Sequence, residues 1–150
     1  MANPKTKRIS FSNRYMFGRV MTDESLCAGV IEAVLGIRPS HIDYLNAEQA
    51  REVNPQSRGI RMDVYVESDG RVYDIEMQVQ PEVALGRRFR YYQSAIDSGL
   101  LRRSQDYGEL AESHIVFLCL ADPFGASLPV YTIERSCKED PRIDISCGAH

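Results

Sequence analysis

The chain has 150 residues, 43% of them hydrophobic, which is enough for one globular domain with a core but hardly for two. We therefore expect a single domain over 1–150. No apolar run reaches the roughly 18 residues that span a bilayer, and the polar start lacks the hydrophobic stretch of a signal peptide, so we expect a cytoplasmic protein without a membrane partner.

The charge is unevenly distributed along the chain, although the formal net charge of −3 argues against indiscriminate nucleic-acid binding. Residues 1–20 carry Lys and Arg but no acid, and we expect a basic tail over about 1–12. Residues 86–104 carry five arginines against Asp97 alone. Two interpretations explain these stretches equally well. One is a solvated tail together with an ordinary exposed helix face, and the other is a surface that contacts phosphates.

Two helices are predicted near the start of the chain. Residues 14–21 form a short one. A second is predicted over 23–35, with Thr22 as the N-cap and Gly36 at the end. The apolar stripe of this second helix consists of Leu26, Cys27, Val30, Ile31, Val34 and Leu35. Glu24 falls at the edge of the stripe and is therefore placed to reach a site at the rim of the core.

Residues 41–45 are predicted to form a short strand, and the polar residues 46–59 a loop. The clearest element is a hairpin over 59–79, because Asp69-Gly70 is the preferred centre of a two-residue type I′ turn. This turn sets Ser68 opposite Arg71. Counting back along both strands then places Asp63 directly opposite Glu76.

The alternation of the hairpin side chains separates a core face from an acidic face. The core face is predicted to hold Met62, Val64, Val66, Tyr73, Ile75 and Met77. The acidic face holds Arg61, Asp63, Tyr65, Glu67, Val72, Asp74, Glu76 and Gln78. Carboxylates directly opposite each other, with Cβ atoms about 5 Å apart, are destabilising unless solvent, a proton or a cation lies between them. A divalent metal is the obvious candidate.

The rest of the chain completes a mixed sheet. Helical spacing from Leu85 to Leu100 predicts a helix that packs on the sheet, near the acids. The apolar run 115–120 predicts a buried strand, and further strands are predicted at 130–133 and 143–146. The order of helices and strands indicates an α/β (α+β) fold with a mixed sheet flanked by helices.

These features resemble the PD-(D/E)XK nuclease superfamily, whose restriction-endonuclease-like core is α-β-β-β-α-β with Asp on the second strand and Glu-x-Lys on the third. Asp63 and Glu76-Met77-Gln78 occupy those places. The run from Ile75 to Gln78, Ile-Glu-Met-Gln, is similar to the third strand of the branch of recombination-promoting nucleases and transposases. The resemblance also includes Asn13–Phe17, Arg88, Tyr91-Tyr92, Gln105–Tyr107 and Asp122–Phe124.

The resemblance implies a metal-dependent DNA endonuclease that hydrolyses phosphodiester bonds and is linked to recombination or transposon-like elements. It implies that Asp63, Glu76 and the backbone carbonyl of Met77 bind Mg²⁺ (or Mn²⁺). Asp63, Glu76 and Gln78 would be the catalytic residues, with Gln78 positioning the attacking water.

Residues around this set have expected supporting roles. Glu24 and Asp74 are candidate outer acids. Arg88, with Arg87 and Tyr91, is expected to bind DNA phosphates, although Arg88 could instead pair with Asp63 or Glu76 when no metal is present, and Tyr91 could equally stack or pack. Cleavage of both strands would favour a homodimer.

Three departures from the family pattern support alternatives. Gln78 stands where the family usually has Lys, Arg14 stands where members often carry Asp, and family chains generally run beyond residue 150, so we expect a C-terminal truncation relative to the family. The alternative function is a catalytically inactive nuclease-fold domain that binds DNA or a protein partner. A third is an interaction module whose acidic face carries no metal.

Overall fold

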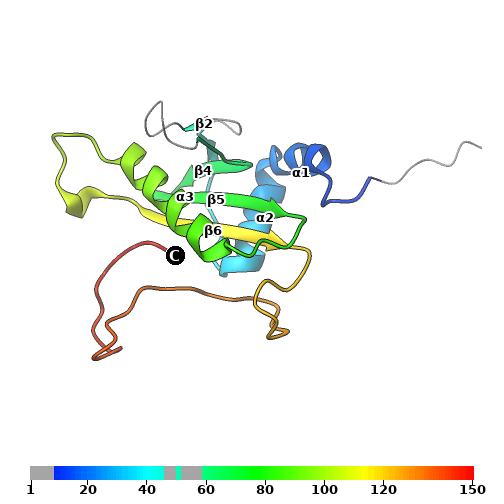
Figure 1. The fold of residues 1–150 in the computed structure, drawn as a ribbon. Helices are drawn as coiled ribbons and strands as arrows, with labels where there is room; N and C mark the ends of the chain where they lie inside the picture. The colour runs from blue at the N-terminus through cyan, green and yellow to red at the C-terminus, as the bar shows by residue number, and fades with distance from the viewer. Residues whose placement is uncertain (1–8, 46–49, 52–58) are drawn as a thin grey trace, which may run out of the picture.

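Figure 1 shows the computed structural model of the chain, which describes residues 9–45, 50–51 and 59–150. Its centre is a four-stranded mixed sheet with the strand order β1-β4-β5-β6. These strands are β1 (Asp43–Tyr44), β4 (Val64–Ser68), β5 (Arg71–Gln78) and β6 (Glu112–Cys119). Strand β4 is antiparallel to both β1 and β5, whereas β6 runs parallel to β5. The predicted mixed sheet is confirmed, and it is consistent with a restriction-endonuclease-like core.

The central hairpin has the predicted register. Ser68 pairs with Arg71 and Val64 with Ile75, and the turn residues Asp69 and Gly70 both have positive φ, 52° and 73°. Both central residues of a type I′ turn require positive φ, which explains the Asp-Gly pair. The ladder of β4 begins only at Val64, after a bend in the chain.

Helices cover both faces of the sheet. On one side α1 (Arg14–Met21) and α2 (Glu24–Leu35) enclose a core cluster, and on the other side α3 (Leu85–Leu100) encloses a second one (Figure 1). The first cluster includes Phe17, Met21, Cys27, Ile31, Val64, Val66, Tyr73 and Ile75. The second includes Ile60, Met62, Tyr65, Val72, Tyr92, Ile96 and Ile115.

Two details of the predicted faces are wrong. We expected one core face and one acidic face, but α3 buries the acidic face as well, so acids and apolar side chains share a core there. Met62 packs in the second cluster instead of beside Val64. The reason is that a bend at Asp63 separates β3 (Ile60–Arg61) from β4 and interrupts the alternation of side chains.

The predicted helices are largely confirmed. Helix α1 has the predicted bounds, and α2 ends at Gly36 in the left-handed conformation, with φ 69°. The N-cap of α2 is Asp23, whose carboxylate accepts a hydrogen bond from the backbone N–H of Leu26 at 3.0 Å. Thr22, predicted as that cap, instead ends α1. Leu26 lies outside the core and is 51% exposed.

The strands predicted at 130–133 and 143–146 are wrong. The Asp122 carboxylate accepts hydrogen bonds from three backbone N–H groups and from the Tyr131 hydroxyl, which folds this stretch into a closed turn. Farther along, residues 148–150 return to β6, where Ser113 forms a bridge with Ala149 (Figure 1). The edge of the sheet that a new strand would need is therefore partly taken by the end of the chain.

Two predictions fall largely outside the described residues. They are the first eight residues of the basic tail and most of the loop expected over 46–59. Within that loop, β2 (Ala50–Arg51) is a strand and pairs with β3. In the part of the chain that the structure describes, no helix is long and apolar enough to cross a bilayer.

The turn geometry predicts opposite effects for two Gly→Ala substitutions. Gly70→Ala should lower the free energy of unfolding by about 1–2 kcal/mol, because a Cβ is strained at positive φ. Gly29→Ala in α2, where an added Cβ meets no atom within 4 Å, should raise it by up to about 1 kcal/mol. Urea denaturation of both variants measures the effects, and a stabilised Gly70→Ala variant would contradict the turn assignment.

Candidate active site

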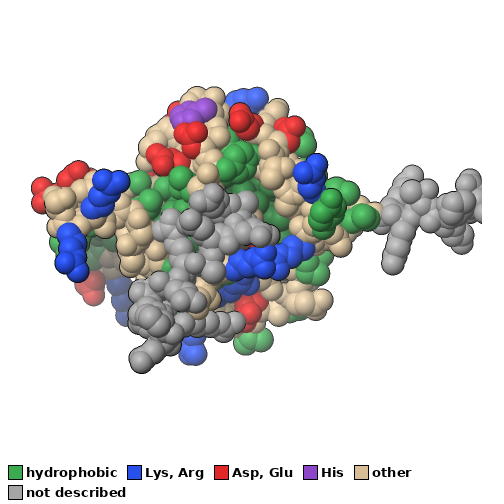
Figure 2. Space-filling view, turned by 90° about the horizontal axis from the view of Figure 1, so that it is seen from above, with side chains coloured by type: hydrophobic (Ala, Val, Ile, Leu, Met, Phe, Trp, Pro, Cys, Tyr) green, Lys and Arg blue, Asp and Glu red, His purple; other side chains and the backbone are tan. Residues whose placement is uncertain are grey.

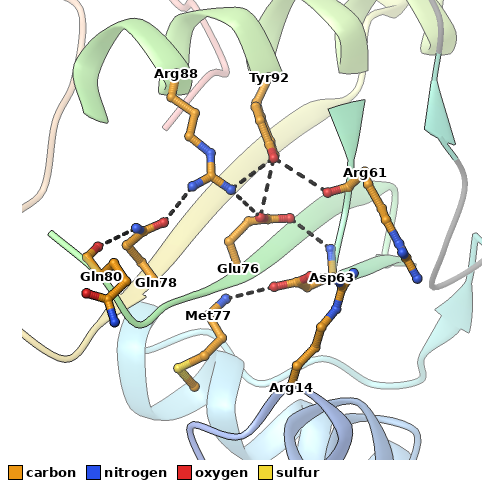
Figure 3. A network of polar contacts seen from close by, with 9 residues as sticks. All are labelled: Arg14, Arg61, Asp63, Glu76, Met77, Gln78, Gln80, Arg88 and Tyr92. Atoms are coloured by element: carbon orange, nitrogen blue, oxygen red, sulfur yellow. Dashed lines mark hydrogen bonds and ion pairs between the residues drawn. The ribbon is translucent and has the colours of Figure 1, made fainter. Parts of the chain in front are cut away.

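Asp63 and Glu76 lie side by side and are joined through the backbone (Figure 3). The backbone N–H of Asp63 donates to Glu76 Oε1 at 2.8 Å, and the backbone N–H of Met77 donates to Asp63 Oδ2 at 3.2 Å. Each bond ties one carboxylate to the chain segment that carries the other. The two acids are therefore held together although their charges repel.

A cation does lie against this pair, and it is the guanidinium of Arg88 on α3. Its Nη2 donates to Glu76 Oε2 at 2.8 Å and its Nη1 to Gln78 Oε1 at 2.5 Å (Figure 3). The guanidinium carbon also lies 5.0 Å from the ring centres of both Tyr92 and Phe117. Aromatic faces attract a cation, so these rings stabilise Arg88 in the position from which it pairs with Glu76.

Tyr92 connects the helix to the site. Its hydroxyl accepts a hydrogen bond from Arg88 Nη2 at 3.0 Å and lies 3.5 Å from Glu76 Oε2. Helical spacing predicted Tyr92 only as a core residue. It is buried in the second core cluster, but its hydroxyl also reaches the acids, which apolar spacing by itself does not reveal.

Burial changes the protonation of the acids beneath α3. Glu76 is only 2% exposed, and this burial raises its pKa to about 7 although the nearby Arg88 charge and the Asp63 N–H act in the opposite direction. Asp74, two residues earlier on the same face of β5, is fully buried, and its carboxyl interacts with that of Glu76. Burial and the neighbouring Glu76 charge raise the pKa of Asp74 well above its ordinary value.

The other carboxylate, Asp63, faces a hollow of about 670 Å³ between α1 and the end of β3. Arg14 reaches into this region from the first turn of α1, with its Nη2 3.6 Å from Asp63 Oδ1 (Figure 3). In the sequence, Arg14 marks a position where the family pattern often has Asp. Its position in the basic stretch of residues 1–20 was the available signal that a cation lies there instead.

The remaining predicted site residues occupy different surroundings. The Gln78 amide is fully engaged, because its Nε2 donates to the Gln80 carbonyl while its Oε1 accepts from Arg88. Glu24 is exposed at the start of α2, where burial raises the pKa of Tyr44 and the charge of Glu24 adds a smaller contribution. On α3, Arg87 is exposed and Tyr91 packs partly against the second core cluster.

The donors present fit a magnesium-type ion. Mg²⁺ prefers oxygen ligands and typically binds through one or two carboxylates while keeping several waters. Asp63 and Glu76 offer such oxygens next to each other, the backbone of Met77 lies against Asp63, and the buried carboxyl of Asp74 neighbours Glu76. Across the described ranges, no group of three or more His, Cys, Asp or Glu side chains is arranged to hold a metal.

Comparison with known proteins identifies a family. The sequence model of the family described as PD-(D/E)XK nuclease family transposase matches residues 7–127. This range includes both carboxylates, α3 and β6. No curated protein and no solved structure matches the chain significantly.

The raised pKa of Glu76 predicts a pH-dependent stability in the absence of metal. Between its ordinary value of 4.5 and about 7, the folded state holds a proton that the unfolded state has lost, so stability falls as pH rises through this window. From pH 5 to pH 8 in EDTA, the wild type should lose on the order of 2 kcal/mol more than Glu76→Gln. Urea denaturation at both pH values tests this. Glu67→Gln on β4 serves as the matched control and should follow the wild type.

Proposed function

Because the chain belongs to the PD-(D/E)XK nuclease family transposases, we propose that it is a metal-dependent DNA endonuclease that acts in recombination or transposition. One observation carries this proposal: the reciprocal backbone bonds that hold Asp63 and Glu76 together under α3. Two adjacent carboxylates cost stability unless a charge or a proton compensates them. A bound divalent cation would compensate the repulsion between the two carboxylates.

The proposed chemistry is hydrolysis of a phosphodiester bond. This reaction is slow without a catalyst because the anionic backbone repels hydroxide and the transition state gathers further negative charge. A bound Mg²⁺ or Mn²⁺ would supply a Lewis acid for the phosphate and lower the pKa of its water. In this proposal Asp63, Glu76 and the Met77 carbonyl hold the ion.

The residues of α3 and β5 have proposed roles in binding and orienting the substrate. Arg88 would exchange its contact with Glu76 for a phosphate oxygen, because a guanidinium stays charged and can bind phosphate through two N–H groups. Gln78 would orient the attacking water, since an amide can donate and accept hydrogen bonds but cannot remove a proton. Arg87 would contact a neighbouring phosphate and Tyr91 would pack beside it. Glu24 and Asp74 remain candidate outer acids.

A second candidate function is a catalytically inactive domain that binds DNA or a protein partner. It is favoured by the state of Gln78, which takes the place of the usual Lys and has both ends of its amide engaged. The pairing of Arg88 with Glu76 favours it too, because a metal would have to displace or share this partner. The two candidates differ in whether bound metal leads to cleavage.

Plasmid cleavage tests the proposed hydrolysis. The wild type with Mg²⁺ or Mn²⁺ should convert supercoiled plasmid to the nicked form, and Asp63→Asn or Glu76→Gln should lower the rate at least about 100-fold, because losing a ligand removes several kcal/mol of transition-state stabilisation. Glu67→Gln should cleave like the wild type. Linear product without a nicked intermediate would indicate two copies acting together. Cleavage that persists in both site variants would rule out this site.

Calorimetry separates an active site from an inactive one. Mn²⁺ titrated into the wild type should give a saturable binding heat, and binding should be lost in the Asp63→Asn variant, because Asp63 supplies a hard oxygen ligand. Retained binding together with no plasmid cleavage would select the inactive nuclease fold. If Mn²⁺ neither binds nor raises the thermal midpoint, the metal-dependent endonuclease fails.

A further inference from the structure

The hollow beside Asp63 is lined on one side by the outer face of α1. Phe17 and Met21 of this helix are buried in the core, so the face that includes Arg14, Tyr15 and Arg19 is left toward the hollow and solvent. Residues three and four apart lie next to each other on a helix, so Tyr15 neighbours Arg19, and Arg14 neighbours Gly18, which also lines the hollow. The hollow therefore has a wall of exposed, polar and aromatic groups.

The charge of this hollow is strongly one-sided. Arg14, Arg19 and Arg61 line it, and among the described residues that line it Asp63 is the one acid. Figure 2 looks down on the molecule and shows Lys and Arg side chains gathered on this face. Arg14 is 64% exposed even though it lies close to Asp63, so its guanidinium is accessible to a ligand in solvent. A surface of this kind attracts an anion.

The floor of the hollow is open at Gly18. A Cβ built at this glycine meets no atom within 4 Å, so the backbone of α1 can be approached closely there. Tyr15, one turn earlier, is exposed and lies beside the arginines. Proteins that hold a nucleic-acid strand without reading its sequence combine a basic groove with such stacking rings.

We propose that the hollow between α1 and β3 binds the sugar–phosphate backbone of one DNA strand and leads it to Asp63. Arg14, Arg19 and Arg61 contact successive phosphates, and Tyr15 stacks on an adjacent base. Arg14 leaves Asp63 when a phosphate arrives, because the phosphate offers it a stronger partner. This inference rests on the proposed function, since it supplies the substrate path to the same two carboxylates.

Binding of a fluorescein-labelled single-stranded oligonucleotide of about 20 nucleotides, followed by anisotropy in EDTA, tests the phosphate contacts. Each of Arg14→Gln, Arg19→Gln and Arg61→Gln should weaken binding and reduce the slope of log K against log salt by about 0.7, the effect of losing one phosphate contact on a single strand. The matched control is Arg142→Gln, an exposed arginine that pairs with Asp140 far along the chain. It should bind like the wild type. An unchanged affinity and slope in the triple Arg→Gln variant would overturn the inference.

A second pair of variants tests the hollow itself without removing an arginine. Gly18→Gln and Gly18→Glu have side chains of equal size and differ only in charge. Gly18→Glu should bind the oligonucleotide roughly threefold to tenfold more weakly than Gly18→Gln, because the new carboxylate faces the phosphates. Thermal midpoints of both variants confirm that they fold. Equal affinities of the folded pair would place the strand elsewhere and overturn the inference.

The assays distinguish this inference from the proposed hydrolysis. If the wild type binds DNA through the arginines but cleaves with neither Mg²⁺ nor Mn²⁺, DNA binding in the hollow is supported and the proposed hydrolysis is contradicted. If the wild type cleaves in an Asp63-dependent way while the triple variant binds and cleaves equally well, the proposed hydrolysis is supported and DNA binding in the hollow is contradicted.

Discussion

The burial of Glu76 beneath α3 is the constraint on which the site depends. A carboxylate that is almost fully removed from water must gain a proton, a cation or several hydrogen bonds. Glu76 receives the guanidinium of Arg88 and the backbone N–H of Asp63, and its pKa still rises because these partners do not fully replace water. The parallel crossover from β5 through α3 to β6 makes this pairing possible, since it lays the helix over the acids.

The same arrangement limits how the site can work. Arg88 lies against the rings of Tyr92 and Phe117 and donates hydrogen bonds to Gln78 and to the Tyr92 hydroxyl. Its contact with Glu76 is therefore one part of a connected network. A ligand that takes Glu76 must also be compatible with the rest of this network. The fully buried carboxyl of Asp74, next to Glu76, adds a second cost in stability. Such costs are common at functional sites, where the arrangement of charges serves binding more than stability.

The two arginines nearest the acids come from opposite sides. Arg88 reaches Glu76 from α3, whereas Arg14 reaches Asp63 from α1. Arg14 stands where members of the family often carry an acid, so the electrostatic character of this corner differs from the pattern that the family resemblance implies. A basic group there favours an anionic ligand beside Asp63, and it also competes with a metal for the same oxygen. The position of Arg14 therefore bears on both proposed functions.

The sequence alone determined the helices, the central hairpin and the neighbourhood of the two acids. Asp69-Gly70 defined the turn, and the alternation of β-strands then placed Asp63 beside Glu76, because both rules depend only on backbone geometry. Only the tertiary structure decided that the acidic face is buried, that Met62 changes sides and that Arg14 meets Asp63. These outcomes depend on how α1 and α3 pack against the sheet and on a bend at Asp63. The sequence patterns of single elements do not encode such contacts between segments far apart in the chain.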